Sequence, residues 1–137
     1  MTIEEQTVGS IDRGVVVLVG VTQRDGPSEA RWLADKVVNL RIFPDDDGKM
    51  NRSLVDIGGG ALIVSQFTLY GDARKGRRPS FVRAAQGDDA EHVYDDVVDA
   101  FGAAGVETQT GSFGAMMQVS LTNDGPVTIL LDSDKTF

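Results

Sequence analysis

The chain has 137 residues, of which 13 are Lys or Arg and 21 are Asp or Glu, so its formal net charge is −8. This length predicts one domain, residues 1–137, with a core large enough to need no disulfide. The negative charge argues against a protein that coats nucleic acid, but it leaves room for local docking of an RNA end. The absence of cysteine and the single histidine argue against a disulfide framework, a cysteine nucleophile and a zinc site. An acidic N-terminus without an apolar run predicts a soluble cytoplasmic protein with no membrane partner.

The first half of the chain predicts a strand, a helix, a hairpin and a second strand. The β-branched run Val15–Val21 indicates a central strand that is buried on both faces. Pro27 begins a stretch with apolar residues at helical spacing, which predicts a helix of about 14 residues. Asp47-Gly48 lies between two β-like segments and predicts a hairpin. The segment Ala61–Leu69 is then predicted to be a strand.

The second half predicts one long helix followed by three β-like segments. Apolar residues share one face of Asp88–Gly105, acids crowd its first turn, and the final glycine provides a stop. The β-like segments are Val106–Thr110, Met117–Thr122 and Val127–Leu131. Together these elements predict an α+β fold with two main helices and a mostly antiparallel or mixed sheet.

Conventional catalytic constellations are missing from the sequence. His92 lies beside the apolar stripe of the long helix, where a solvated histidine is the ordinary finding, and no carboxylate pair stands out. Two polar segments interrupt apolar runs instead: the SQFTL segment, Ser65–Leu69, and the NDGPVT turn, Asn123–Thr128. The ordinary interpretation of the first is that Ser65 and Thr68 make hydrogen bonds along the sheet while Gln66 faces water.

Two further features have both an ordinary and a functional interpretation. The run Arg74–Arg78 holds four positive charges, which indicates either a solvated loop or a local grip on phosphates. The segment Phe113–Met117 offers an aromatic ring and thioethers that fill a core or sandwich a base. On the residues alone, core packing is the preferred interpretation.

The two polar segments resemble the signature motifs SQxxL and NxGPxT of the D-aminoacyl-tRNA deacylase (D-tyrosyl-tRNA deacylase) family. The resemblance continues, in family order, through Lys49–Ser53, Arg74–Phe81 and Phe113-Gly114. It implies the barrel-like α+β fold of that family. Members of the family begin with an additional strand, so the resemblance implies that residues 1–137 lack the first β-strand and leave one sheet edge unpaired.

The resemblance implies hydrolysis of the ester that links a D-amino acid to tRNA, without metal or cofactor, and action on glycyl-tRNA mischarged on tRNA-Ala. It also implies a homodimer with active sites at the subunit interface. In this arrangement Gly125-Pro126, joined by a cis bond, enters the partner's pocket and rejects L side chains by backbone contact. The remaining implied roles are catalysis by Ser65, Gln66, Phe67 and Thr68, pocket support by Asn123 and Thr128, and adenosine binding by Phe113 and Met117.

Charge alone, rather than the family, suggests Arg77 and Arg78 as contacts of the tRNA acceptor stem. Thr68 is a candidate nucleophile, but a threonine hydroxyl needs an adjacent base, so activation of water with help from the ribose 2′-hydroxyl is favoured. Two alternatives stay open. One is a catalytically impaired dimeric scaffold that binds RNA or DNA ends, and the other is an unrelated small-ester hydrolase that uses Thr68.

Overall fold

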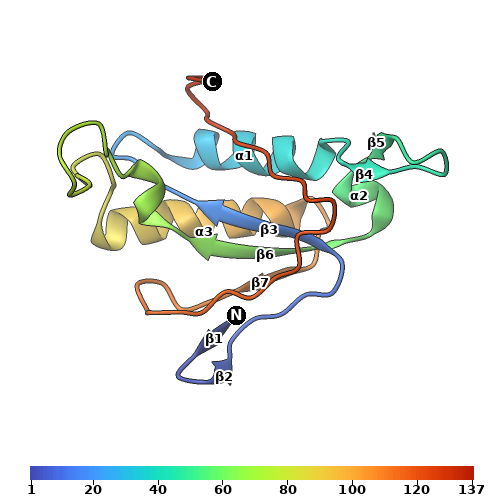
Figure 1. Cartoon of the computed structure of the whole chain (residues 1–137), viewed down its shortest axis with the longest axis horizontal. Helices are drawn as coiled ribbons and strands as arrows, with labels where there is room; N and C mark the ends of the chain where they lie inside the picture. The colour runs from blue at the N-terminus through green and yellow to red at the C-terminus, as the bar shows by residue number, and fades with distance from the viewer.

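A three-stranded parallel sheet forms the centre of the molecule in the computed structural model, which describes residues 1–137 (Figure 1). Its strand order is β3 (Gly14–Val19), β6 (Gly60–Ser65) and β7 (Thr108–Thr110). The connections from β3 to β6 and from β6 to β7 contain the helices α1 (Pro27–Asn39) and α3 (Gly87–Ala103), respectively. Parallel neighbours require such crossovers, since a tight turn can only return an antiparallel strand.

The other elements are short and lie at the margins of this sheet. The antiparallel pairs are β1 with β2 and β4 with β5. A short helix, α2, precedes β6, and a 3₁₀ helix, η1, follows it. Their bounds are β1 Thr2–Ile3, β2 Gln6–Thr7, β4 Phe43–Pro44, β5 Met50–Arg52, α2 Leu54–Ile57 and η1 Phe67–Tyr70.

The core consists of two apolar clusters separated by β6. Ala61 and Ile63 point into the larger cluster, which also receives the apolar faces of α1 and α3. Leu62 and Val64 point to the opposite face and pack with Met1 in the smaller cluster. Because these four strand residues are at most 3% exposed, β6 is held rigidly on both faces.

Helix α3 is also tied to β6 by a buried hydrogen bond. The Tyr94 hydroxyl donates to the Ile63 carbonyl oxygen at 2.6 Å. Burial of this phenol, followed by the nearby Asp95 carboxylate, raises the pKa of Tyr94 to about 12. The phenol therefore stays protonated at neutral pH and keeps the helix fixed against the strand.

The structure confirms the α+β class, both main helices and the hairpin at Asp47-Gly48. Strand pairing is mixed rather than mostly antiparallel: the three-stranded sheet is parallel throughout, and antiparallel pairing is confined to two separate two-stranded sheets. None of the helices is long and apolar enough to span a bilayer.

Several strand predictions were wrong. The run Val15–Val21 was expected to be the central strand, but β3 lies at an edge, Leu18 is 46% exposed, and β6 is central. The strand expected over Ala61–Leu69 ends at Ser65, where η1 takes over.

The segments Met117–Thr122 and Val127–Leu131 form no regular strand, and their one bridge joins Gln118 to Thr2. Strands need a neighbour to accept and donate backbone hydrogen bonds, and a single chain offers these two segments none beyond that bridge.

Candidate active site

The SQFTL segment leaves the sheet at the carboxyl end of its central strand. Ser65 is the last residue of β6, and the Gln66 N–H donates to the Val19 carbonyl oxygen at 2.8 Å, which fixes the exit to the end of β3. Phe67–Tyr70 then turn as η1. The carboxyl ends of parallel strands are the usual place for ligand sites in open sheets, because the loops that follow them converge there.

A hydrogen bond joins the two most chemically useful side chains of this segment. The Gln66 Nε2 donates to the Thr68 Oγ1 at 2.6 Å, and both side chains reach solvent. An amide cannot take a proton at neutral pH, and His92 is exposed on α3 with no hydrogen bond to this hydroxyl. Thr68 is therefore hydrogen-bonded to no general base.

Two aromatic contacts shape the same region. Phe67 is 55% exposed, and its ring meets the edge of Phe81 with centroids 5.1 Å apart. The Arg83 guanidinium lies 5.5 Å from the centroid of the Tyr70 ring. Burial, and then the nearby carboxylate of Asp25, raise the pKa of Tyr70 above its ordinary value, so the phenol is a proton donor rather than a base at neutral pH.

The sequence reasoning missed Tyr70, Phe81 and Arg83 as neighbours of the site. Phe81 lies in the block Arg74–Phe81 that resembles the family, and this was the available signal for it. The position of Arg83 over a ring depends on the path of the intervening loop, which no local pattern encodes.

Asn123 closes the NDGPVT turn from within. Its Oδ1 accepts the Val127 N–H at 2.8 Å, and its Nδ2 donates to the Thr128 Oγ1 at 3.0 Å. The Gly125-Pro126 bond is cis, as the family resemblance implies. Gly125 has a φ of +137°, and a Cβ there would lie 2.8 Å from the Val127 Cγ2, so a glycine is required.

The two signature segments do not meet within one chain. No hydrogen bond joins them, and the red C-terminal segment turns back at the opposite side of Figure 1 from η1. Each segment is ordered by its own hydrogen bonds rather than by contact with the other.

Phe113 and Met117 are also not brought together. Phe113 packs against the larger cluster, with its ring centroid 5.9 Å from that of Tyr94. Met117 packs against the smaller cluster on the other face of β6. Both side chains are partly buried, so core packing accounts for the buried part of each side chain and leaves the rest exposed to solvent.

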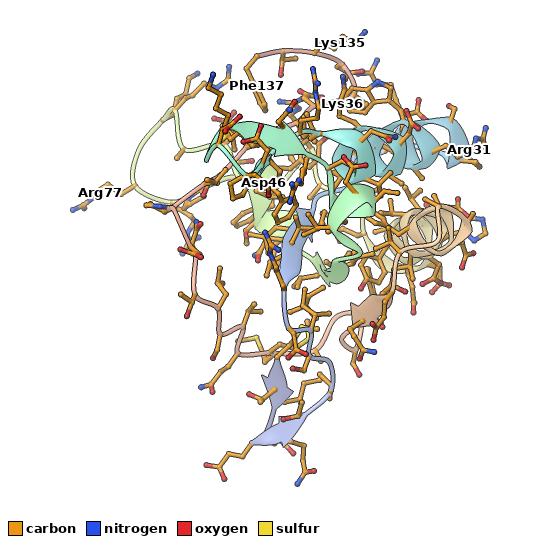
Figure 2. The ribbon with its side chains drawn as sticks, turned by 90° about the vertical axis from the view of Figure 1, so that its right-hand side faces the viewer. Arg31, Lys36, Asp46, Arg77, Lys135 and Phe137 are labelled. Atoms are coloured by element: carbon orange, nitrogen blue, oxygen red, sulfur yellow. The ribbon has the colours of Figure 1, made fainter.

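The basic run Arg74–Arg78 forms an exposed loop next to η1. Arg74 is engaged with Asp72, whose carboxylate accepts from the Arg74 Nε at 2.9 Å and from Nη2 at 2.6 Å. The side chains of Arg77 and Arg78 are exposed and make no ion pair, and Figure 2 shows Arg77 pointing away from the body of the protein.

We expect this loop to loosen in acid at a pH that the Asp72 contacts determine. The hydrogen bonds from Arg74 lower the pKa of Asp72 from 3.8 to about 2. Since the folded pKa is the lower one, the ordering is complete above pH 3.8 and is lost as the pH falls through about 2. An NMR titration of the Asp72 carboxyl, with amide exchange at Arg74, measures this transition.

The Asp72→Asn variant is the control, and its loop should exchange quickly at every pH. A carboxyl that titrates near 3.8 in the wild type would contradict the arrangement.

A family profile described as D-Tyr-tRNA(Tyr) deacylase matches residues 1–132, which include both signature segments. The chain belongs to this family. Curated members named D-aminoacyl-tRNA deacylase are 56% identical over 135 residues in Thermus aquaticus and 55% identical over 137 residues in Clostridioides difficile. These alignments cover 98% and 100% of the chain, and 89% and 92% of the relatives.

Another relative differs in its name. A Bacillus subtilis protein named inactive D-aminoacyl-tRNA deacylase is 57% identical over 95% of the chain and 98% of its own length. Among solved structures, the c-Myc DNA unwinding element binding protein has a TM-score of 0.89 at 37% identity, covering 96% of this chain and 90% of that one. A probable eukaryotic D-amino acid tRNA deacylase, at a TM-score of 0.65 and 21% identity over 77% of each chain, shares the fold.

Proposed function

We propose that this member of the deacylase family hydrolyses the ester of D-aminoacyl-tRNA and releases free tRNA and the D-amino acid in the cytoplasm. The observation that carries the proposal is the family match over residues 1–132, with both the SQFTL segment and the NDGPVT turn intact. The direct test is release of labelled D-tyrosine from D-tyrosyl-tRNA by the purified chain. If the correctly folded protein releases no D-tyrosine, the proposal is wrong.

In the proposed mechanism, water adds to the ester carbonyl carbon and the ribose oxygen leaves with a proton. Ser65 and Gln66 line the pocket beside Phe67, and main-chain N–H groups at the start of η1, which have no acceptor within the turn, stabilise the oxyanion. The 2′-hydroxyl of the terminal ribose assists the water. This assignment is supported by the absence of a base next to Thr68.

The proposed selectivity for D-amino acids comes from a second copy of the chain. Gly125 and Pro126 lie exposed at the tip of a turn that does not reach the SQFTL segment of its own chain. A homodimer with shared sites brings the turn of one subunit to the pocket of the other, with Asn123 and Thr128 holding it in shape. Exposed apolar side chains that flank this turn in the sequence support a subunit contact: Leu121 is 57% exposed and Leu130 is 68% exposed.

Phe113 and Met117 are the proposed contacts of the terminal adenine. Both side chains are partly exposed, and a ring and a thioether both suit the face of a base. Because they pack on opposite faces of β6, Phe113 and Met117 of one chain do not form a sandwich by themselves. The proposal therefore predicts that they contact the adenosine from different sides of the assembled site.

We expect Thr68→Val to retain hydrolysis within about tenfold of the wild-type rate, since a barrier change of about 1.4 kcal/mol corresponds to that factor. Valine keeps the shape of the side chain and removes only the hydroxyl, which has no base to activate it. Single-turnover deacylation of D-tyrosyl-tRNA measures the effect.

The matched comparison uses a tRNA that ends in 2′-deoxyadenosine, for which we expect a loss of about 100-fold or more, as for removal of a donor at a reacting centre. Complete loss in a folded Thr68→Val variant, with an acyl adduct trapped on the wild-type threonine, would instead support the ester hydrolase that uses Thr68.

The second candidate function is a dimeric scaffold that binds RNA or DNA ends and has lost turnover. The names of two similar proteins support this second candidate. The Bacillus subtilis relative is named inactive, and the solved structure with a TM-score of 0.89 is named for binding a DNA element. Binding of uncharged tRNA without release of D-tyrosine from D-tyrosyl-tRNA would establish it.

A further inference from the structure

Positive and negative charges occupy different parts of the chain. Residues 84–134 contain ten acidic residues and no Lys or Arg, whereas all basic residues except Lys135 precede them. Six of these acids lie on α3, so this helix presents a strongly negative surface. A chain with a net charge of −8 can hold a polyanion only where positive charge is concentrated and acids are absent.

The basic loop, residues 73–79, is such a place. Its base is closed by two hydrogen bonds, from the Asp72 N–H to the Ser80 carbonyl oxygen at 2.7 Å and from the Ser80 N–H to the Asp72 carbonyl oxygen at 2.9 Å. Arg74 is neutralised by Asp72 and acts as a brace for the loop. Lys75, Arg77 and Arg78 remain exposed and make no ion pair, so three positive charges are free to meet a ligand.

The loop begins next to the candidate site. Asp72 follows η1 after one residue, and Phe81, which follows the loop, packs on Phe67 of η1. Seven residues that leave and return to one bridge extend at most about 12 Å from it. The free charges therefore reach the polynucleotide next to its terminal adenosine rather than a distant part of a tRNA.

The acidic helix lies on the other side. In Figure 2, Arg77 stands on the side opposite α3, whereas Arg31, a residue of α1, lies on the side of α3. Most of the acids of α3 are exposed, including Asp95 and Asp99. A polyanion that approaches along α3 is repelled, whereas one that approaches along the basic loop is attracted.

We propose that the basic loop binds the phosphate backbone of the acceptor end through Lys75, Arg77 and Arg78, while the acids of α3 exclude RNA from the opposite side. The two surfaces together fix the side from which the substrate enters. This inference rests on the proposed function for its substrate, but RNA binding by the loop can be measured without catalysis.

The experiment compares Arg77→Ala/Arg78→Ala with Arg31→Ala/Lys36→Ala, which removes the same charge from exposed positions on α1. Each protein is assayed on D-tyrosyl-tRNA and on D-tyrosyl-adenosine, which lacks every stem phosphate. For each protein we divide kcat/KM on tRNA by kcat/KM on the nucleoside ester. In the loop variant we expect this ratio to fall by about tenfold, because KM for tRNA rises. The salt slope of log kcat/KM on tRNA should shrink by about 1.4 to 1.8, the value for two lost phosphate contacts. The α1 variant should keep both quantities.

Three outcomes would overturn the inference. An equal fall of kcat/KM on both substrates in the loop variant would make the loop part of the ester site. An equal fall in both variants would assign the effect to net charge. A shift of the loop variant to a smaller oligomer would place the loop in a contact between subunits.

If the wild type cleaves neither substrate, the proposed function fails, and binding of uncharged tRNA then decides the inference. Weaker binding by the loop variant alone supports it, and equal binding by both variants refutes it. Asp95→Lys/Asp99→Lys tests the acidic surface: we expect tighter binding of uncharged tRNA with no gain in kcat/KM. Unchanged binding would refute exclusion by α3.

Discussion

D-Tyrosyl-tRNA is expected to be deacylated at least about 100-fold faster than L-tyrosyl-tRNA, and glycyl-tRNA at a rate comparable with the D substrate. A hundredfold difference needs about 2.7 kcal/mol, which a clash between a side chain and fixed backbone readily supplies. Gly125 and Pro126 present backbone, which has no rotamer to relieve such a clash. Glycine has no side chain to reject, and a site that works by exclusion gains nothing from the absence of a group.

One time course on the three charged tRNAs at equal enzyme concentration measures this selectivity. The control is hydrolysis without enzyme, which sets the background for each ester. Rapid loss of L-tyrosine would show that the Gly125-Pro126 turn does not screen the pocket. Full resistance of glycyl-tRNA would mean that the site binds a D side chain positively, which contradicts selection by exclusion.

Gly14→Ala is expected to destabilise the fold by about 3 kcal/mol or more, the upper end of the cost of overpacking. A Cβ at this position would lie 1.9 Å from the Gly60 carbonyl oxygen, in the first residue pair of β3 and β6. The clashing atom belongs to backbone, so no side-chain movement relieves it. Since β6 delivers Ser65 to the site, hydrolysis should fall together with the midpoint of unfolding.

Gly102→Ala is the matched control for this substitution. Gly102 lies in α3, and a Cβ there meets no atom within 4 Å. Alanine is the better helix former, so we expect a gain of about 0.5 to 1 kcal/mol. Urea unfolding of both variants measures the pair of opposite effects. Equal stabilities would show that β3 and β6 do not pair in solution as they do in the structure.

Local patterns in the sequence were sufficient wherever a structure depends on near neighbours. The apolar spacing after Pro27 and after Asp88 predicted α1 and α3, because a helix makes its hydrogen bonds within itself. Asp47-Gly48 predicted the hairpin of β4 and β5 for the same reason. The SQFTL and NDGPVT segments identified the family, which the match over residues 1–132 then showed.

Only the tertiary structure decided what depends on distant partners. A β-branched run indicates that a strand is buried, but it does not indicate which strands lie beside it. The run Val15–Val21 was therefore expected to be central, although β6 occupies the central position. The hydrogen bond from Gln66 to Thr68 depends on the chain leaving the sheet at Ser65, and it leaves the threonine without a base. Phe113 and Met117 are separated because they pack on opposite faces of β6. Sequence therefore determined the helices, the turns and the chemical groups. Packing against β6 determined which of these groups meet. The reason is that side-chain partners distant in sequence are selected by shape and burial rather than by local pattern.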